Sequence, residues 1–285
     1  MYIDSRVRPP YKTYLEQAIY KKEHNRPWTS RFEVSYPENH PDLTMDSMFQ
    51  DMEEANIGIA LVAGRLSCGP TNGDDVTELA AAYPEKLRCF PDINPLHGEA
   101  ALKEIDDRVI HGPCAGVCME FGFNPIEPMY ANDKRAWAVY QKCADNNLPL
   151  YLSFGGFIGP DQSYCHPMLI EEVAKAFPNL RILLAHGCYP FVQEACHMAM
   201  NQPNVYLAPD MYLFGVPGSR DYIDGGNTII REKLLYGSAY PIFDMKQSVE
   251  YYLHCGLKES ALEYVMYKNA AAFLGIEERT NSKEW

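Results

Sequence analysis

The sequence predicts an α/β protein with a (β/α)₈ TIM barrel. Short apolar runs rich in β-branched or aromatic residues alternate with longer stretches of helical periodicity, which is typical of repeated βα units and a parallel sheet. Eight such runs can be counted along the 285 residues. The length also suits one α/β barrel, so we expect a single domain over residues 1–285.

The expected strands are mostly apolar on both faces, as buried parallel strands are. They cover residues 2–3, 58–63, 87–93, 116–121, 148–154, 181–185, 205–208 and 233–237. The expected helices carry apolar residues at spacings of three and four. They cover residues 44–56, 74–83, 98–111, 133–147, 167–177, 190–200, 245–255 and 259–274.

Two long connections interrupt this alternation. Residues 8–43 are rich in Pro, Tyr and charge without clear periodicity, and residues 212–227 contain a Gly-Val-Pro-Gly stretch. Both follow strands, so we expect both at the C-terminal mouth of the barrel, where sites of this fold are built. Connections of this length are typical of functional lids.

The composition narrows the class of partner. Hydrophobic residues make up 47% and charged residues 22%, as in a soluble globular protein. The net charge of -13 argues against a nucleic-acid surface and against an anionic membrane, which leaves a small molecule as the expected partner. Nine cysteines without a C-x-x-C pair, and no signal peptide or membrane segment, predict a cytoplasmic protein.

Four motifs occur in order along the chain. They are Leu-Pro-Leu-Tyr-Leu-Ser-Phe-Gly-Gly at 148–156, a segment from His-Pro-Met to Ala-His-Gly at 166–187, Leu-Leu-Tyr-Gly-Ser-Ala-Tyr-Pro at 234–241, and Asn-Ala-Ala-Ala-Phe-Leu within 268–274. From Ile3 to Ile276 the chain resembles the amidohydrolase-related family of the amidohydrolase superfamily. That family includes aminocarboxymuconate semialdehyde decarboxylase, aromatic-acid decarboxylases and pyrone dicarboxylate lactonases. The resemblance implies a TIM barrel and a homo-oligomer.

The resemblance also implies a degenerate metal site. Metal-dependent members carry Asp-x-His-x-His on the first strand, where residues 4–8 here read Asp-Ser-Arg-Val-Arg. The family's strand-five His falls on Ser153 and its strand-eight Asp on Ala239, and only the strand-six His remains, as His186. An arginine cannot donate a lone pair to a metal, and a catalytic zinc needs about three protein ligands. We therefore expect no metal and no other cofactor.

Arg6 and Arg8 alternate with Val7, so on a strand they would share one face, the face that carries metal ligands in relatives. One interpretation is a clamp for a substrate carboxylate or phosphate. The other is an internal salt-bridge cluster with Asp4, Glu120 or Asp210, because buried arginines need partners. A third is that the strand ends early and leaves Arg8 exposed.

Three residues are candidate catalytic groups at strand ends. His186 precedes a glycine, so we expect its ring to point into the mouth as a general acid or base, unless it is a relic bonded to its neighbours. Glu120 at the end of the expected strand 116–121 and Asp210 after the expected strand 205–208 could each act as a base, an orienting acid or the partner of an arginine.

Further residues are expected to contact the substrate. Ser153 would lie beside His186, but the Gly-x-Ser-x-Gly elbow of serine hydrolases is absent, which argues against a nucleophilic serine. Tyr189, Tyr212 and Tyr240 lie in loops after strands and are expected to line a pocket for a planar or partly apolar ligand.

The leading functional hypothesis is a metal-independent, lactonase-like hydrolase that acts on a small carboxylated cyclic or aromatic compound. The similar pyrone dicarboxylate lactonases work without metal, but keep an Asp as the water-activating base where this chain has Ala239. A replacement base would have to come from elsewhere. The alternatives are a decarboxylase or other lyase of the same family, and a catalytically inactive barrel that serves as a binding or regulatory subunit.

Overall fold

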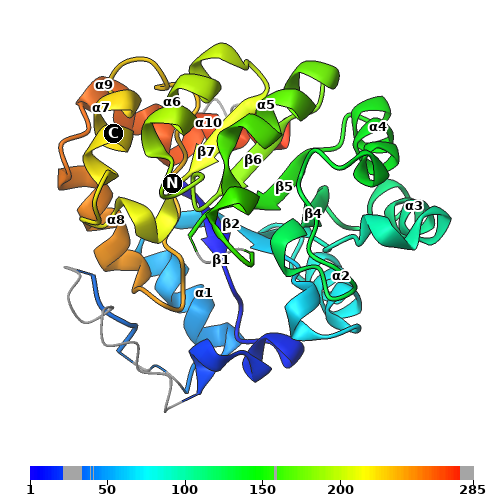
Figure 1. The fold of residues 1–285 in the computed structure, drawn as a ribbon. Coiled ribbons are helices and arrows are strands. Elements are labelled where there is room, and N and C mark those ends of the chain that lie inside the picture. The colour runs from blue at the N-terminus through cyan, green and yellow to red at the C-terminus, as the bar shows by residue number, and fades with distance from the viewer. Residues whose placement is uncertain (22–33, 39, 41, 157–158, 277–285) are drawn as a thin grey trace.

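The computed structural model describes residues 1–21, 34–38, 40, 42–156 and 159–276. Strands lie at the centre of the molecule and helices surround them (Figure 1), so the predicted (β/α)₈ barrel is present. Part of the long connection predicted over residues 8–43, namely 22–33, 39 and 41, lies outside the described residues.

The parallel strands of the described chain form two sheets, in the orders β1-β2-β3 and β4-β5-β6-β7. The strands are β1 (Tyr2–Val7), β2 (Ile57–Ala63), β3 (Leu87–Phe90), β4 (Val117–Met119), β5 (Leu150–Ser153), β6 (Ile182–Ala185) and β7 (Val205–Ala208). A parallel bridge between Asp92 and Cys118 joins the two sheets at one seam.

The strand predicted over residues 233–237 is not a continuous strand in the described structure, but its backbone closes the barrel. The Leu235 N–H donates to Leu207 O at 2.8 Å, and the Ser5 N–H donates to Tyr236 O at 3.0 Å. The segment therefore lies between β7 and β1. Its ladder is interrupted because the Tyr236 N–H donates to Val265 O instead of to a neighbouring strand.

The first strand is longer than the two residues predicted, and this extension carries Arg6 toward the mouth. Ile3 belongs to the cluster that fills the barrel interior, whereas Val7 packs in the layer between the barrel and the helices. An irregular register between Asp4 and Val7 accompanies this change of face.

The helices of the described chain surround the strands. They are α1 (Met45–Glu54), α2 (Asn72–Ala82), α3 (Glu99–Ile105), α4 (Trp137–Asp145), α5 (Pro167–Ala176), α6 (Val192–Asn201), α7 (Ser219–Gly226), α8 (Met245–His254), α9 (Glu259–Glu263) and α10 (Asn269–Leu274). The predicted helix 98–111 continues from α3 into a π-helical turn, Asp106–Ile110, and a second π-helical turn, Tyr264–Lys268, joins α9 to α10.

The prediction of a loop throughout 212–227 is wrong for its second half, which forms α7. This helix has few apolar residues, so its periodicity is weak in the sequence. It is held by tertiary contacts, because Tyr222 is fully buried and its hydroxyl donates to Gly187 O at 2.9 Å.

Local sequence signals fix several helix starts. At α1 the Thr44 hydroxyl accepts from the Ser47 N–H at 3.1 Å, and the Ser47 hydroxyl accepts from the Thr44 N–H at 2.8 Å, which is a capping box. At α8 the Asp244 carboxylate accepts from the Gln247 N–H at 2.8 Å. Such caps satisfy backbone donors that the first helical turn leaves free.

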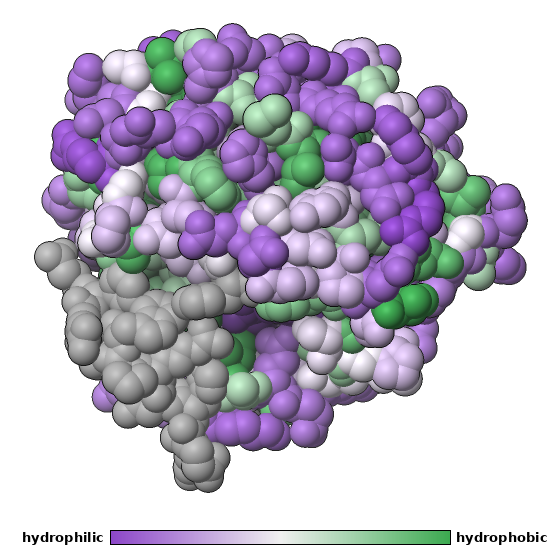
Figure 2. Space-filling model, in the orientation of Figure 1, coloured by the Kyte–Doolittle hydropathy of each residue, from purple (hydrophilic) through white to green (hydrophobic). Residues whose placement is uncertain are grey.

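Side chains fill the barrel interior, so a ligand site has to lie at its mouth. The interior cluster includes Leu61, Phe90, Tyr151 and Leu183. The outer surface seen in Figure 2 is mostly hydrophilic, with small separate hydrophobic areas. None of the helices in the described part of the chain has the length and apolar character that crossing a bilayer requires.

Candidate active site

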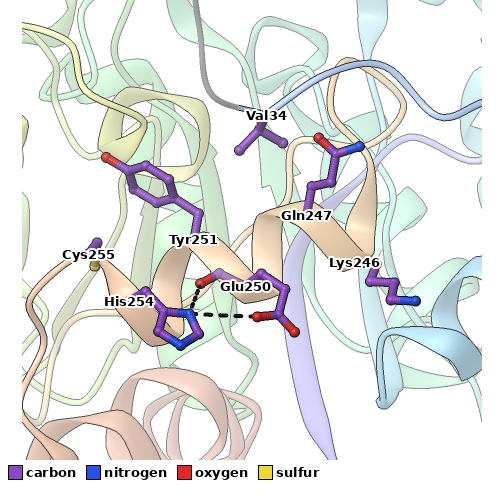
Figure 3. Close-up of a pocket in the computed structure, with 7 residues that line it drawn as sticks. All are labelled: Val34, Lys246, Gln247, Glu250, Tyr251, His254 and Cys255. Carbon is purple, nitrogen blue, oxygen red and sulfur yellow. Dashed lines mark hydrogen bonds and ion pairs between the residues drawn. The ribbon is translucent and has the colours of Figure 1, made fainter.

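A cavity of about 400 Å³ lies at the C-terminal ends of the strands. Its lining includes Arg8, Arg65, His186 and Tyr212, together with residues 16–19 of the long connection after β1. A hollow of about 510 Å³ lies along α8, with Tyr251 among its lining residues (Figure 3), but none of the predicted site residues is in it. We take the mouth cavity as the candidate site because charged groups from several strands converge there.

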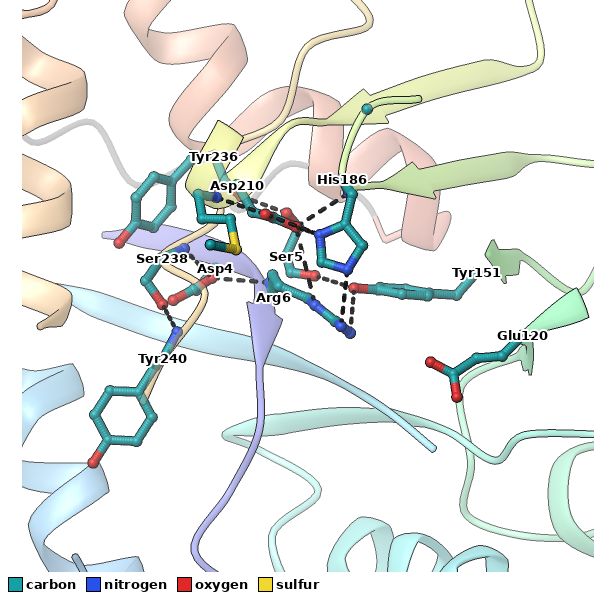
Figure 4. Close-up of polar contacts among 12 residues, drawn as sticks. Asp4, Ser5, Arg6, Glu120, Tyr151, His186, Asp210, Tyr236, Ser238 and Tyr240 are labelled. Atoms are coloured by element: carbon teal, nitrogen blue, oxygen red, sulfur yellow. Dashed lines mark hydrogen bonds and ion pairs between the residues drawn. The ribbon is translucent and has the colours of Figure 1, made fainter. Parts of the chain in front are cut away.

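His186 and Asp210 form a buried pair at the floor of this cavity. They meet because Ala185, the last residue of β6, pairs in register with Ala208, the last residue of β7. The His186 Nδ1 atom lies 2.8 Å from Asp210 Oδ2 and 3.1 Å from Oδ1 (Figure 4). Asp210 also accepts the backbone N–H groups of His186, at 3.1 Å, and of Met211, at 2.6 Å. The carboxylate is therefore fixed and orients the imidazole ring.

The backbone turns sharply where the site residues leave their strands. His186, Asp210 and Ala239 have φ values of 69°, 45° and 62°, in the left-handed region that non-glycine residues rarely adopt. Each such residue costs on the order of 1 kcal/mol and persists only where the surrounding structure holds it. The three turns lie at the ends of successive strand positions around the mouth.

Arg6 places a guanidinium directly beside this pair. Its Nη2 lies 3.3 Å from His186 Nε2, its Nη1 donates to the Tyr151 hydroxyl at 3.5 Å, and its Nε lies 4.0 Å from Asp210 Oδ2. Burial alone would lower the pKa of Arg6, but the nearby Tyr151, Asp210 and Glu120 side chains outweigh it and raise the pKa of Arg6 above its ordinary value. Arg6 is thus a permanent internal cation.

Arg65, which sequence analysis missed, pairs with Glu120. It lies two residues after the end of β2, and its Nη2 lies 2.9 Å from Glu120 Oε1. Both side chains are nearly inaccessible. A basic residue just after an apolar strand was the available signal, but the family motifs do not include this position. Arg65 lines the cavity, whereas Glu120 is not among its described lining residues.

Arg8 lacks a comparable partner among the residues that the structure describes. Within the described residues it makes no ion pair, and its Nε atom has no hydrogen-bond partner. Burial, followed by the charges of Arg6 and Arg65, lowers the pKa of Arg8 well below its ordinary value. Arg8 is 8% exposed and lines the cavity, so the alternative of an early strand end with an exposed Arg8 is wrong.

Asp92 is a second residue that sequence analysis missed. It follows β3, is buried, and accepts the Leu66 N–H through Oδ2 at 3.2 Å. Burial and then the charge of Glu120 raise the pKa of Asp92 well above its ordinary value. Among the described residues neither Asp92 Oδ1 nor Glu120 Oε2 has a hydrogen-bond partner. Burial and the nearby Glu120 thus favour the neutral form of Asp92, and Arg65 pairs with Glu120.

The remaining predicted residues differ in whether they line the cavity or are buried in the core. Tyr212 lines the cavity, with its ring edge-on to His186 at 5.6 Å and stacked on Tyr189 at 4.5 Å. Ser153 is buried, and its hydroxyl has no hydrogen-bond partner in the described chain. Tyr240 is fully buried and its hydroxyl donates to Asp51 on α1 at 3.1 Å, which places it in the core and not on the cavity.

The donor set at the mouth does not fit a divalent metal ion. The Nε2 atom of His186 faces the Arg6 guanidinium, which repels cations and can only donate hydrogen bonds. No group of three or more His, Cys, Asp or Glu side chains in the described part of the chain is arranged to hold a metal.

Asp4 is a buried carboxyl beneath the site. Its Oδ1 accepts the N–H groups of Arg6, at 2.9 Å, and Ser238, at 3.0 Å, while its Oδ2 has no partner among the described residues (Figure 4). Burial raises the pKa of Asp4 from 3.8 to about 6. The folded chain therefore binds a proton at Asp4 more tightly than the unfolded chain.

This shift predicts the effect of Asp4→Asn on stability. Ionisation of Asp4 lowers the free energy of unfolding of the parent, by about 3 kcal/mol in total, as the pH rises from about 4 to about 6. The asparagine side chain of the variant stays neutral, so the variant does not lose this stability. Urea denaturation across this range should show the difference in unfolding free energy growing in favour of the variant. The exposed Asp46→Asn control should show no such trend. A pH-independent difference for Asp4→Asn would contradict a raised pKa.

Comparison with known proteins identifies the family and supports the fold. Residues 3–276 match the amidohydrolase family. An uncharacterised TIM-barrel protein from Bordetella bronchiseptica is 32% identical, with a TM-score of 0.87 over 96% of this chain and 98% of that chain. A search of the curated proteins gives no match.

Two more distant structures share the fold. A 5-carboxyvanillate decarboxylase from Sphingomonas paucimobilis is 13% identical, with a TM-score of 0.69 over 97% of this chain and 99% of that chain. A dihydroxybenzoic acid decarboxylase from Polaromonas sp. JS666, with bound manganese and the inhibitor 2-nitroresorcinol, is 14% identical, with a TM-score of 0.66 over 96% of each chain. The family match over nearly the whole chain shows that this protein belongs to the amidohydrolase family.

Proposed function

We propose that this protein is a metal-independent hydrolase that opens a lactone or similar acyl bond in a small carboxylated cyclic or aromatic compound. One observation carries the proposal: His186, whose ring is held by Asp210, lines the same cavity as Arg8, which has no ion-pair partner within the described chain. A proton acceptor and a cation that no described residue pairs with lie in one cavity, which fits hydrolysis of an anionic substrate.

Arg8 is the proposed anchor for the substrate carboxylate. Its guanidinium can form two parallel hydrogen bonds with a carboxylate, and the bound anion would offset the repulsion among Arg6, Arg8 and Arg65. The cavity of about 400 Å³ suits a small molecule, and Tyr212 offers an aromatic edge to a planar ring. In this arrangement Glu120 holds Arg65 in place and does not act as the base.

His186 is the proposed general base. Burial lowers the pKa of His186, the charges of Arg6 and Arg8 lower it further, and Asp210 opposes them, so the ring is neutral at neutral pH. Nε2 accepts a proton from water, whose oxygen forms a bond to the acyl carbon while the carbonyl electron pair moves onto oxygen. Arg6 stabilises this oxyanion and Asp210 stabilises the imidazolium. When the intermediate collapses, the C–O bond of the ring breaks and the leaving oxygen takes the proton from Nε2.

Turnover of a panel of small carboxylated lactones would test this function. We expect acid release in a pH-stat that is unaffected by a chelator. The substitution His186→Ala should lower kcat by about 10²- to 10⁴-fold, the range for loss of a general base. His197→Ala, on the exposed side of α6, is the matched control and should retain parental turnover.

Other results would favour the alternatives. Release of CO₂ from hydroxybenzoates without lactone opening would indicate a decarboxylase, and thermal stabilisation by carboxylates without turnover would indicate a binding barrel. Activity that is lost with a chelator and restored by a divalent ion would contradict metal independence. The cytoplasmic location and the homo-oligomer stay predictions.

A further inference from the structure

Arg6 contacts the one atom of His186 that the proposed reaction needs. Its Nη2 lies 3.3 Å from Nε2, on the side of the ring opposite Asp210. A guanidinium nitrogen can only donate, so Nε2 has to accept and cannot carry a proton while this contact is made. The proton of the neutral ring is then on Nδ1, where the Asp210 carboxylate, which can only accept, receives it.

The surroundings hold Arg6 in this position. Its Nη1 reaches the Tyr151 hydroxyl on β5, and that hydroxyl in turn donates to Ser5 O at 3.0 Å. Its Nε faces Asp210 at 4.0 Å. The space for this contact depends on Gly237, since a Cβ there would lie 3.2 Å from the Cβ atoms of both Arg6 and Asp210.

We propose that Arg6 is a positioning residue that keeps Nε2 of His186 unprotonated in the resting site and passes its N–H to the substrate carbonyl oxygen when the substrate binds. The transfer of this hydrogen bond frees Nε2 to accept the proton of water and at the same time polarises the carbonyl. An imidazolium would set the N–H of Nε2 against an N–H of Arg6, two donors facing each other, which excludes the protonated ring from the resting geometry.

The groups that face His186 determine how each variant would change the protonation of its ring. The charged ones are Asp210, which follows β7, Arg6 from β1, and Arg8, which directly follows β1. Tyr212 presents its ring edge. Removal of the Arg6 guanidinium leaves Asp210 as the contacting charge, which favours a ring protonated on both nitrogens. Removal of Arg8 takes away a positive charge of the same kind but leaves the contact with Nε2 in place.

Nitrogen NMR of ¹⁵N-histidine-labelled protein tests the resting state without any substrate. The His186 resonances are assigned from their loss in His186→Gln. We expect the parent to show a protonated Nδ1 and an unprotonated Nε2 at neutral pH, and Arg6→Met to gain the second ring proton at a higher pH than the parent. The matched control Arg8→Met should keep Nε2 unprotonated, and so should Arg6→Lys, which retains a donor and a charge.

An Nε2–H signal in the parent, or the same response in Arg8→Met as in Arg6→Met, would overturn the proposal. If Arg6→Met does not fold, the spectra of the parent and of Arg6→Lys still show whether Nε2 is unprotonated.

The catalytic half of the inference rests on the proposed hydrolase function. In lactone hydrolysis, Arg6→Lys should lower kcat at least tenfold with little change in KM. An unchanged kcat would overturn the catalytic role of Arg6 but not its effect on the resting ring. Absence of hydrolysis of any lactone would remove the proposed function but leave the NMR result standing.

Discussion

Replacement of Arg65 by methionine is expected to lower the free energy of unfolding by about 3 to 5 kcal/mol, the range for breaking a buried ion pair from one side. The Arg65 Nη2 atom lies 2.9 Å from Glu120 Oε1, and the Glu120 side chain is fully inaccessible. Without the guanidinium the Glu120 charge would stay buried beside Asp92, whose pKa that charge already raises. Urea denaturation at neutral pH measures the loss.

The double variant Arg65→Met with Glu120→Gln is the control for this interpretation. With no buried charge left unpaired, most of the lost stability should return, because an ion pair replaced on both sides is often close to neutral in free energy. A single variant that costs less than about 1 kcal/mol, the scale of an exposed pair, would show that the pair contributes little to the fold.

Arg8→Met is expected to have the opposite effect on stability and a large effect on binding. In the ligand-free protein it removes a buried cation whose pKa is lowered by burial and by Arg6 and Arg65, so the free energy of unfolding should rise by about 1 to 3 kcal/mol. The same change should weaken carboxylate binding by about 10- to 100-fold, because a hydrogen bond to a charged group contributes about 1.5 to 3 kcal/mol.

Calorimetric titration with benzoate measures the binding part, and benzamide, which has the same ring without the charge, is the matched ligand. Arg8→Lys should give an intermediate affinity, since an ammonium keeps the charge but loses the bidentate fork. If Arg8→Met destabilised the protein as strongly as Arg65→Met, Arg8 would be a structural ion-pair residue and the substrate-clamp interpretation would fail.

Much of the architecture could be predicted from local patterns. The alternation of apolar runs and helical stretches predicts the barrel, and the ordered motifs place His186 after a strand. The prediction fails where tertiary contacts replace local signals. The Tyr236 N–H bonds to Val265 instead of to a neighbouring strand, and α7 is held by the buried Tyr222 and not by a strong apolar periodicity.

For the candidate site, too, the sequence predicts some features and not others. The position of Asp210 after a strand follows from the sequence, because parallel strands bring their C-terminal ends to one edge. The position of Arg6 at this edge is implied only by the family motif, since the predicted first strand covers residues 2–3 and the observed β1 extends to Val7. The partners of these residues do not follow, since Tyr240 turns into the core toward Asp51 while Tyr212 faces the cavity. Both are tyrosines in loops after strands, and only their packing distinguishes them.

The sequence by itself determined that this chain has an amidohydrolase barrel in which arginines stand where relatives carry metal-binding histidines. Only the tertiary structure decided what those arginines do: Arg6 contacts the base, and Arg8 is left facing the cavity. The physical reason is that ion pairing depends on distances of a few ångströms between side chains from strands far apart in the chain. Arg65 shows this most clearly, because no motif marks it and Glu120 lies 55 positions away.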